Sequence, residues 1–448
     1  MKKQLYILLF GLSLAFPAMA QQKDTTASFS LQDAINYSLT HQVNIKNAKI
    51  DEQIASNTVK KTIGIGLPQV SASADFNDFL KVATSLLPAI IFDKDAAPGE
   101  FIPVQFGTKY NSTLGINATQ LLFDGSYLVG LKASKTYKEL STKNTARTRI
   151  ETVVAVTKAY YSVLVSNEQL TLIDANLERL RKSLSDTEQM LKNGFVEKID
   201  VDRLSVLNNN LITERENVIR LLALNLNLLK FQMGLTVNSN ITLLDKITSV
   251  NTDQTPILND GTVYQKRIEY SLLQTQKKLN ELDVKRYKSA FLPNLAAFAS
   301  YSRSFQNDSF SSLYDKSFPT SLVGLKLSIP IISGGQKLYD VRNAKLESLK
   351  TDNNLINLQN AIDLEVAQAQ TTYLNGQKSL ENQKRNMELA KEVLRVTKIK
   401  YDQGVGSSLE VTTAETSLKE AQNNYINALY DMLINKVNLD KALGNINY

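Results

Sequence analysis

Apolar residues recur every seven positions along two long stretches of the chain. In the later stretch they are Tyr373, Leu380, Met387, Leu394 and Tyr401, and in the earlier one Val163, Leu170, Leu177, Leu184 and Leu191. This spacing keeps one face of a helix against a partner helix and gives a left-handed supercoil. Residues 126–192 and 336–402 contain no proline, so each stretch is predicted to form one helix roughly 100 Å long. Helices of this length predict a coiled coil.

The two stretches are copies of one unit. Three glycines of the first copy recur in the second, each pair 210 residues apart (335 − 125, 404 − 194, 444 − 234): Gly125 and Gly335, Gly194 and Gly404, Gly234 and Gly444. Because no insertion separates the copies along this stretch, the pattern indicates duplication of one structural unit. Each copy is predicted to be a helical hairpin with its turn at the middle glycine.

Segments that alternate between apolar and polar residues precede each hairpin, as in strands with one apolar face. The first repeat has one around 70–76 and one over 109–123, and the second has one around 297–301 and one around 323–329. A Leu-Pro pair opens the first strand of each repeat, at Pro68 and Pro293, and these are 225 residues apart (293 − 68). The first repeat therefore carries 15 extra residues (225 − 210), which we place in a loop at 77–108.

That loop contains several large apolar residues, namely Leu86, Leu87, Ile90, Ile91, Phe92 and Phe101. It either packs over neighbouring loops or forms a partial lid over an opening, and the sequence leaves both interpretations open.

These patterns divide the chain into three parts. Two lysines, an apolar run and Ala18-Met19-Ala20 are typical of a secretory signal peptide at 1–20. Residues 21–235 are the first structural repeat, and 236–448 are a connector and the second repeat. Each repeat is predicted to contain a helix, a strand pair and a long helical hairpin. Four amphipathic strands cannot close a barrel alone, so several chains must contribute strands.

Composition excludes many kinds of chemistry. The absence of cysteine excludes disulfides, thiolate metal sites and cysteine nucleophiles. His41 is the only histidine and lies in a polar stretch, where we expect it to be exposed, so a zinc site of clustered histidines is not available. Neither a phosphate-binding Gly-Lys-Ser/Thr loop nor a Gly-x-Ser-x-Gly elbow occurs. We therefore expect no enzyme and no cofactor.

Charge and hydropathy restrict the partners. A net charge of +7 is mild for a chain of this length and does not indicate nucleic-acid binding. After the signal peptide, no run of about 20 apolar residues remains, so any entry into a membrane is expected to use strands.

With this order of elements, the chain resembles the TolC-like outer membrane efflux family. The matching residues of the second hairpin are Tyr401, Gly404, Leu409, Val411, Ala414, Leu418, Ala421, Tyr425, Ala428, Leu439, Ala442, Leu443 and Gly444. The first hairpin carries a weaker copy in Gly194, Ile199, Val201, Leu204 and Gly234. The resemblance implies a mixed α and β membrane protein: a homotrimeric 12-stranded outer membrane β-barrel, four strands per chain, continuing into a long periplasmic α-helical coiled-coil barrel.

The implied function is the outer membrane channel of a tripartite efflux or secretion system in a Gram-negative bacterium. Such a channel conducts small molecules from an inner membrane efflux pump and a periplasmic adaptor protein to the outside. Polar strand faces would line the lumen and apolar faces would contact outer membrane lipid. A trimeric coiled-coil scaffold and a passive porin are the alternatives. The long hairpins argue against a porin, and the alternating strand pairs argue against a pure scaffold.

The resemblance also places a gate and two docking turns at the hairpin tips. Glu410 matches an acidic gate residue, Tyr401 matches a tyrosine that ties neighbouring hairpins, and Asp200 lies 210 residues before Glu410. Thr413 and Gly406 stand where the family has a second acid and a basic partner, so the closing network is expected to be weaker or built differently. Solvated helix faces are the alternative for both acids. The adaptor-docking turns are Gly194, Phe195, Val196, Gly404, Val405 and Gly406.

Overall fold

The computed structural model describes residues 27–247 and 263–448. The signal peptide predicted at 1–20 and part of the predicted connector lie outside these residues. The described chain forms two units. A helical unit contains residues 27–42, 152–247 and 372–438, and a sheet unit contains residues 43–151, 263–371 and 439–448. Each unit therefore takes residues from both predicted repeats.

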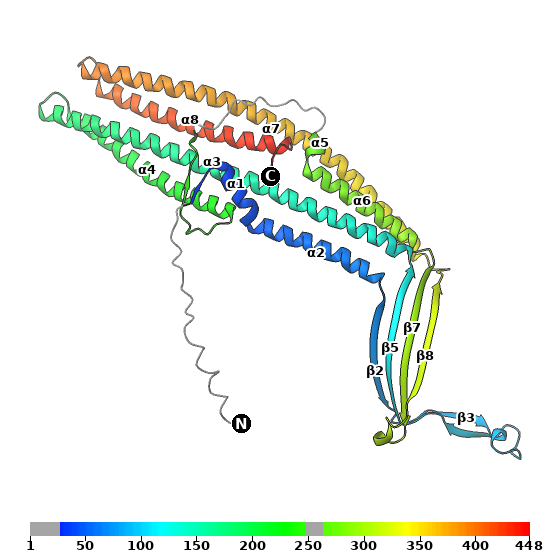
Figure 1. The fold of residues 1–448 in the computed structure, drawn as a ribbon. Coiled ribbons are helices and arrows are strands. Elements are labelled where there is room, and N and C mark those ends of the chain that lie inside the picture. Colours follow the sequence, from blue (N-terminus) through cyan, green and yellow to red (C-terminus); the bar gives the residue numbers. More distant parts are fainter. Residues whose placement is uncertain (1–26, 248–262) are drawn as a thin grey trace, which may run out of the picture. The chain divides into compact units, whose positions relative to one another are not determined.

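The sheet unit is built on four antiparallel strands. They are β2 (Gln69–Asp78), β5 (Tyr110–Phe123), β7 (Asn294–Asn307) and β8 (Phe318–Ser328), in the order β2-β5-β7-β8 (Figure 1). All four predicted strands are confirmed. Since β5 comes from the first repeat and β7 from the second, the two repeats join in one sheet, and β2 and β8 form its edges.

The register gives this sheet one apolar and one mainly polar face. Directly paired residues run across all four strands, and one such row consists of Val70, Ala118, Ala299 and Val323. The next row consists of Ser71, Asn117, Ser300 and Leu322, whose side chains lie on the opposite face. Val70 and Val323 are exposed, so no residue in 27–247 or 263–448 covers the apolar face at its two edges.

The predicted loop at 77–108 contains a small hairpin that the sequence did not predict. Strands β3 (Thr84–Pro88) and β4 (Phe101–Gln105) pair, with a short 3-10 helix, η1 (Ala89–Ile91), following β3. Prolines at positions 88 and 103 interrupt the strand pattern in the sequence. A two-stranded hairpin tolerates these prolines because each of its strands is an edge strand. In Figure 1 this hairpin projects away from the end of the four-stranded sheet.

The first helical stretch is divided in two. Ser30 caps α1 (Leu31–His41), because its Oγ accepts a hydrogen bond from Asp33 N at 3.2 Å. Gln42 is extended, and α2 (Val43–Ile65) follows. Gly234 packs against this break so closely that a Cβ there would lie 2.9 Å from the Gln42 Cα. His41 is exposed, as expected, and its ring stacks on Tyr37 at 3.9 Å.

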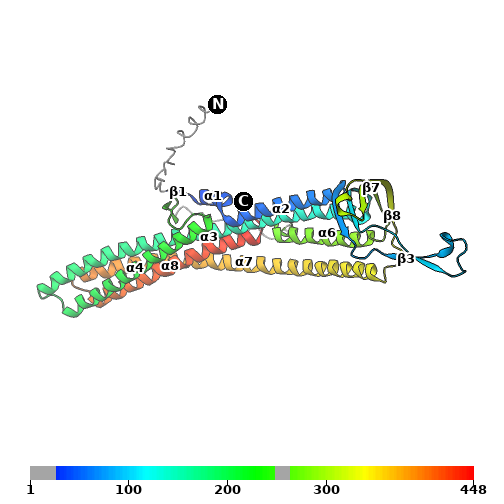
Figure 2. The same ribbon diagram turned by 90° about the horizontal axis from the view of Figure 1, so that it is seen from below.

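The long helices are α3 (Gly125–Lys192) and α7 (Gln336–Asp402), which confirms both predicted stretches. Each is followed by a second helix, α4 (Lys198–Met233) or α8 (Ser408–Ala442). In the helical unit α4 runs alongside α3 and α8 runs alongside α7 (Figure 1, Figure 2). All ten heptad residues are buried or half-buried, as the sevenfold spacing predicts.

At the end of the helical unit away from the hairpin turns, a buried tyrosine joins several segments. The hydroxyl of Tyr160 on α3 lies 2.8 Å from Asp245 Oδ2 and 3.1 Å from the Phe29 carbonyl oxygen. Asp245 also accepts a hydrogen bond from Leu31 N at 2.8 Å. These contacts hold the parallel pair of β1 (Ala27–Phe29) and β6 (Ile241–Leu243) beside α1. Burial raises the pKa of Tyr160, and the hydrogen bond to Asp245 raises it further, so the hydroxyl stays protonated.

In the sheet unit a buried arginine joins three segments. Arg267 lies between α5 (Val263–Lys266) and α6 (Ile268–Ser289) and donates to Glu269 at 2.9 Å and to Glu365 at 2.8 Å. A third bond goes to the Ala442 carbonyl oxygen at 2.9 Å. Burial alone would raise the pKa of Glu269, but the hydrogen bonds and charge of Arg267 lower it overall.

Across residues 27–247 and 263–448, the helices include none with the length and apolar character that crossing a membrane requires.

Candidate functional site

The two predicted turns have the same backbone structure. Gly194 and Gly404 follow α3 and α7 with φ of 76° and 74°, in the left-handed region that favours glycine. Phe195 N donates to the Met190 carbonyl oxygen at 2.9 Å, and Val405 N donates to the Lys400 carbonyl oxygen at 3.0 Å. This i to i−5 bond closes a helix C-terminus in the Schellman arrangement. The 210-residue spacing of the glycines thus reflects one repeated helix ending.

Each turn presents one apolar side chain. Phe195 is 79% exposed and Val405 is 78% exposed, whereas Val196 and Gly406 are half-buried. At Gly406 a Cβ would lie 3.0 Å from Tyr401 N and 3.1 Å from Lys400 Cβ. A side chain at 406 would therefore lie in tight contact with the end of α7.

Asp200 is engaged at the start of α4. Its Oδ2 accepts a hydrogen bond from Glu197 N at 3.3 Å, so it takes part in a capping box, and its Oδ1 lies 3.4 Å from Arg203 Nη1. The carboxylate is 17% exposed. Its negative charge is therefore partly balanced inside its own helix.

Glu410 occupies the equivalent place in α8 and is exposed. Its backbone N–H donates to Ser407 Oγ at 3.2 Å, so a serine performs the capping there. The Glu410 carboxylate makes no ion pair with any residue in 27–247 or 263–448. The two acids predicted for the gate thus have the same sequence position and different surroundings.

Tyr401 connects the two hairpins of one chain. Its hydroxyl lies 3.8 Å from Met190 Sδ on α3, which is a weak contact. The ring borders a small cavity of about 30 Å³ whose other walls come from α3, α4, α7 and α8 and include Ser183, Thr187, Leu204 and Val411. The tips therefore meet through an imperfectly filled space beside Tyr401.

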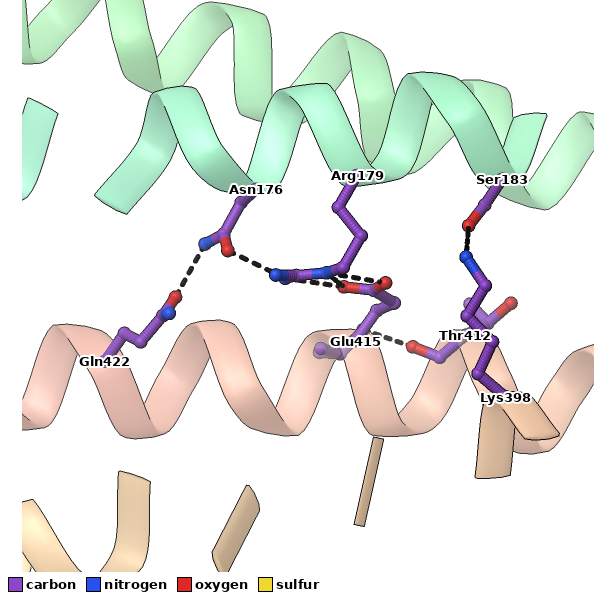
Figure 3. A network of polar contacts seen from close by, with 8 residues as sticks. Asn176, Arg179, Ser183, Lys398, Thr412, Glu415 and Gln422 are labelled. Carbon is purple, nitrogen blue, oxygen red and sulfur yellow. Dashed lines mark hydrogen bonds and ion pairs between the residues drawn. The ribbon is translucent and has the colours of Figure 1, made fainter. Parts of the chain in front are cut away.

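A polar network between α3 and α8 was not predicted (Figure 3). Arg179 Nε and Nη2 lie 3.1 and 3.0 Å from Glu415 Oε1 and Oε2, and the Glu415 side chain is only 8% exposed. Arg179 Nη2 also donates to Asn176 Oδ1 at 2.7 Å, and Asn176 Nδ2 donates to Gln422 Oε1 at 2.6 Å. The network joins the first hairpin to the second at several points along the helices.

A nearby hydrogen bond connects α3 to α7 as well. Lys398 Nζ donates to Ser183 Oγ at 3.1 Å, on the same side of α3 (Figure 3). The sequence does contain a signal for the network. Glu415 follows Val411 by four residues and precedes Leu418 by three, so an acid occupies the apolar face of α8. An acid in that position requires a basic partner when it is buried.

The part of the chain that the structure describes contains no group of three or more histidine, cysteine, aspartate or glutamate side chains that could hold a metal ion.

Comparison with known proteins identifies the family. The family model described as outer membrane efflux protein matches residues 34–205 and 269–445. TolC of Escherichia coli K12 is 24% identical over 391 residues, which cover 84% of this chain and 78% of TolC. The probable efflux pump outer membrane protein TtgC of Pseudomonas putida is 22% identical over 342 residues, which cover 75% of this chain and 69% of TtgC.

Solved structures agree on the fold. The MtrE outer membrane channel of Neisseria gonorrhoeae, in its open state, superposes with a TM-score of 0.74 at 17% identity, over 92% of this chain and 88% of that chain. The matched residues include both hairpin turns and all four strands of the sheet. The family consists of channel proteins rather than enzymes, and its members reside in the outer membrane. The chain belongs to the outer membrane efflux protein family.

Proposed function

We propose that three copies of this chain form the outer membrane channel of a tripartite efflux system. The observation that carries the proposal is the four-stranded sheet, whose two edge strands, β2 and β8, have no partner on their outer sides among the described residues. Unpaired N–H and C=O groups are not tolerated in lipid. Pairing of β2 in one copy with β8 in the next satisfies both edges, and three copies close a barrel of 12 strands.

The two faces of the sheet support this arrangement. The row of Val70, Ala118, Ala299 and Val323 lies on the face that we assign to lipid. Ser71, Asn117 and Ser300 lie on the face that we assign to a water-filled lumen. Apolar-out and polar-in alternation is the pattern of outer membrane barrels.

The helices supply the rest of the conduit. Helices α4 and α7 expose large apolar side chains in the single chain, among them Leu224, Phe231, Leu364 and Leu389. We assign these surfaces to contacts between neighbouring copies, which would wall a tunnel through the periplasm. The family description and the name of TtgC support an efflux role, and we infer that the cargo is a small molecule delivered by an inner membrane pump.

The hairpin tips are the proposed site of docking and gating. Phe195 and Val405 are exposed apolar side chains at the ends of the hairpins, which suits contact with the helical hairpins of a periplasmic adaptor. Threefold symmetry would place three copies each of Asp200 and Glu410 around one opening, with Tyr401 beside them. Such a ring of carboxylates attracts cations and repels anions.

Cysteine crosslinking tests the closure of the sheet. The chain has no cysteine, so every introduced pair reports without background. Ser71→Cys on β2 combined with Leu322→Cys on β8 places the two thiols three strands apart, roughly 14 Å within one chain, which is too far for a disulfide. Because neighbouring strands in a barrel are staggered, Thr320→Cys and Gly324→Cys are tested as further partners of Ser71→Cys. Oxidation should give covalent dimers and trimers.

The control is Ser300→Cys with Leu322→Cys, a directly paired position that should crosslink within one chain and leave monomers on a denaturing gel. Bilayer conductance of the same purified particles separates the alternatives. A gated channel conducts little, a passive porin stays open, and a scaffold conducts nothing. Monomers from every β2–β8 pair, or a particle that never conducts, would refute the proposal.

A further inference from the structure

The apolar face of the sheet carries one basic side chain. Among the residues of β2, β5, β7 and β8, all of which the structure describes, only Arg303 is a basic residue on this face. It pairs with Leu114 on β5 and with Pro319 on β8. Its Nε donates to the hydroxyl of Tyr301 at 3.0 Å, two residues earlier on the same strand. Arg303 is exposed in the single chain. A guanidinium on an otherwise apolar surface requires a specific reason.

Arg303 lies near the end of the sheet that is farther from the helices. Beyond it, Phe305 packs against Tyr314 with ring centroids 5.1 Å apart, and Phe310 packs against Phe76 at 5.9 Å. Tyr110 joins the second cluster, 5.6 Å from Phe310. Aromatic side chains gather where a membrane-spanning strand meets the lipid headgroups. The aromatic clusters therefore place Arg303 just inside the outer headgroup layer.

Within residues 27–247 and 263–448 the guanidinium forms no ion pair, and its Nη1 and Nη2 groups make no hydrogen bond. The acid on this face, Asp78, is in register with Tyr110 and through it with Asn307, two strands away and four residues further along β7. Strand β7 lies between β5 and β8 of the same chain, so joining copies at the sheet edges brings no new strand beside Arg303. The free Nη groups point to a ligand from outside the protein.

We propose that Arg303, oriented by the hydroxyl of Tyr301, binds the phosphate of a lipid headgroup in the outer leaflet. This inference rests on the proposed function, because it needs the apolar face to contact lipid. The planar guanidinium offers two N–H groups in the geometry that phosphate accepts. A shallow groove lined by Ala72, Ala74, Leu114 and Ile116 lies beside Tyr301 and Arg303 and receives an acyl chain of the same lipid. Phosphate recognition and chain burial thus occur at one place.

The test uses the purified trimer in nanodiscs of phosphatidylcholine, into which diphosphorylated lipid A is titrated. The readout is the temperature at which the trimer dissociates. Lipid A should raise this temperature for the natural protein, and Arg303→Gln should raise the half-saturating lipid A concentration at least about tenfold, since a charge-assisted contact is lost. Arg303→Lys should fall between the two, because it keeps the charge and loses the paired N–H groups.

Lys326→Gln is the matched control, since it removes one positive charge from the polar face of β8. It should respond to lipid A like the natural protein. An equal response in Arg303→Gln, with conductance unchanged, would overturn the proposal. Dephosphorylated lipid A acting as well as the phosphorylated form would also overturn it, and so would inorganic phosphate alone giving the full shift. A natural protein that forms no conducting trimer would instead refute the proposed function, whatever lipid A does.

Discussion

The two hairpins have the same order of elements and the same turn, yet α4 and α8 have different cores. Helix α4 buries Leu204, Leu211 and Val218 against α3. The residues 210 positions later in α8 are Ala414, Ala421 and Ala428. In place of these large side chains, α8 buries Val411 and Leu418, whose counterparts in α4 are Val201 and Asn208. Because Ala414 and Ala428 stay buried as well, the buried face of α8 is broader than that of α4.

The neighbours of α8 explain the difference. Leu418 and Ala414 form a cluster with Leu394 of α7, as expected within a hairpin. Helix α8 also contacts α3 through Glu415 and α4 through Lys419, which pairs with Glu214 at 2.5 Å. Within the helical unit, α8 thus contacts α3, α4 and α7. Small residues on its α7-facing side allow close approach, and its other side supplies polar and apolar contacts to the first hairpin.

The polar network between α3 and α8 has no equivalent between α7 and α4. The residues equivalent to Arg179 and Glu415 are Leu389 and Ser205, which cannot form an ion pair, and Leu389 is exposed. The two hairpins share their turn geometry, while their outward surfaces differ because each contacts different neighbours. Surfaces that remain apolar and exposed on α4 and α7 are then the ones to assign to neighbouring copies.

The largest expected effect is at the tips, where the hairpins are most alike. Phe195→Asp with Val405→Asp should abolish efflux, because a carboxylate replaces each exposed apolar contact for the adaptor. Each single variant should retain part of the activity if both turns dock. Drug accumulation in cells that lack their own channel is the measurement, and a native gel checks the trimer.

Asn193→Asp is the control for this experiment, since it adds a charge at the first tip without removing an apolar side chain. Full resistance in the double aspartate variant would contradict docking at the turns. Complete loss in only one single variant would show that the two tips have different partners.

The next effect concerns Leu418 of α8 and its counterpart in α4, Asn208. Leu418 is 1% exposed, so Leu418→Ala should lower the free energy of unfolding by about 2–5 kcal/mol. Its counterpart Asn208 has a buried side-chain oxygen without a hydrogen-bond partner among the described residues. Asn208→Ala should therefore cost less than about 1 kcal/mol. Denaturant titration, followed by the helical circular dichroism signal, measures the free energy of unfolding of both variants. Equal losses in Leu418→Ala and Asn208→Ala would show that α4 and α8 have equivalent cores at this position.

A smaller effect is expected at the α3–α8 joint. Glu415→Gln removes the charge that Arg179 pairs with and should lower the free energy of unfolding by about 1–2 kcal/mol, less than for a fully buried pair because Arg179 is 30% exposed. A double-mutant cycle with Arg179→Met measures the coupling directly. Ser205→Ala in α4 is the matched control and should change stability little. A coupling near zero would mean that the network only fills space.

Local rules predicted the elements whose ends are set by nearby residues. The glycines at 194 and 404 end their helices through backbone conformation, and Ser30 begins α1 through a side-chain cap, so both are visible in sequence. Strand alternation was visible for the same reason. Strands β3 and β4 were not, because prolines interrupt the pattern and both faces of the hairpin are largely exposed.

Long-range contacts explain what else was missed. Strand β1 has three residues and depends on pairing with β6, more than 200 positions away, and on the hydroxyl of Tyr160. The bond from Arg179 to Glu415 depends on which face of α8 meets the other hairpin. The acid on the apolar face of α8 is a local signal for a basic partner, but no local rule names a partner 236 residues away. The gate residues and docking turns stay predictions.

The finest test of the comparison is the pair of acids at the tips. In a trimer both would form rings of three carboxylates, but Asp200 is paired with Arg203 and serves as a helix cap, whereas Glu410 is exposed and makes no ion pair within the described chain. Glu410→Gln should therefore reduce cation selectivity and multivalent cation block more than Asp200→Asn does, and the double variant should exceed both. Single-channel recording near 0.1 M salt measures this, and the differences should disappear at 1 M, where the Debye length is about 3 Å rather than about 10 Å.

Asp202→Asn, which removes an exposed acid two residues from Asp200, should leave selectivity unchanged. An equal effect of Asp200→Asn and Glu410→Gln would mean that Arg203 does not shield its neighbour in the assembled channel, and no effect of either would mean that both acids are solvated helix residues outside the gate.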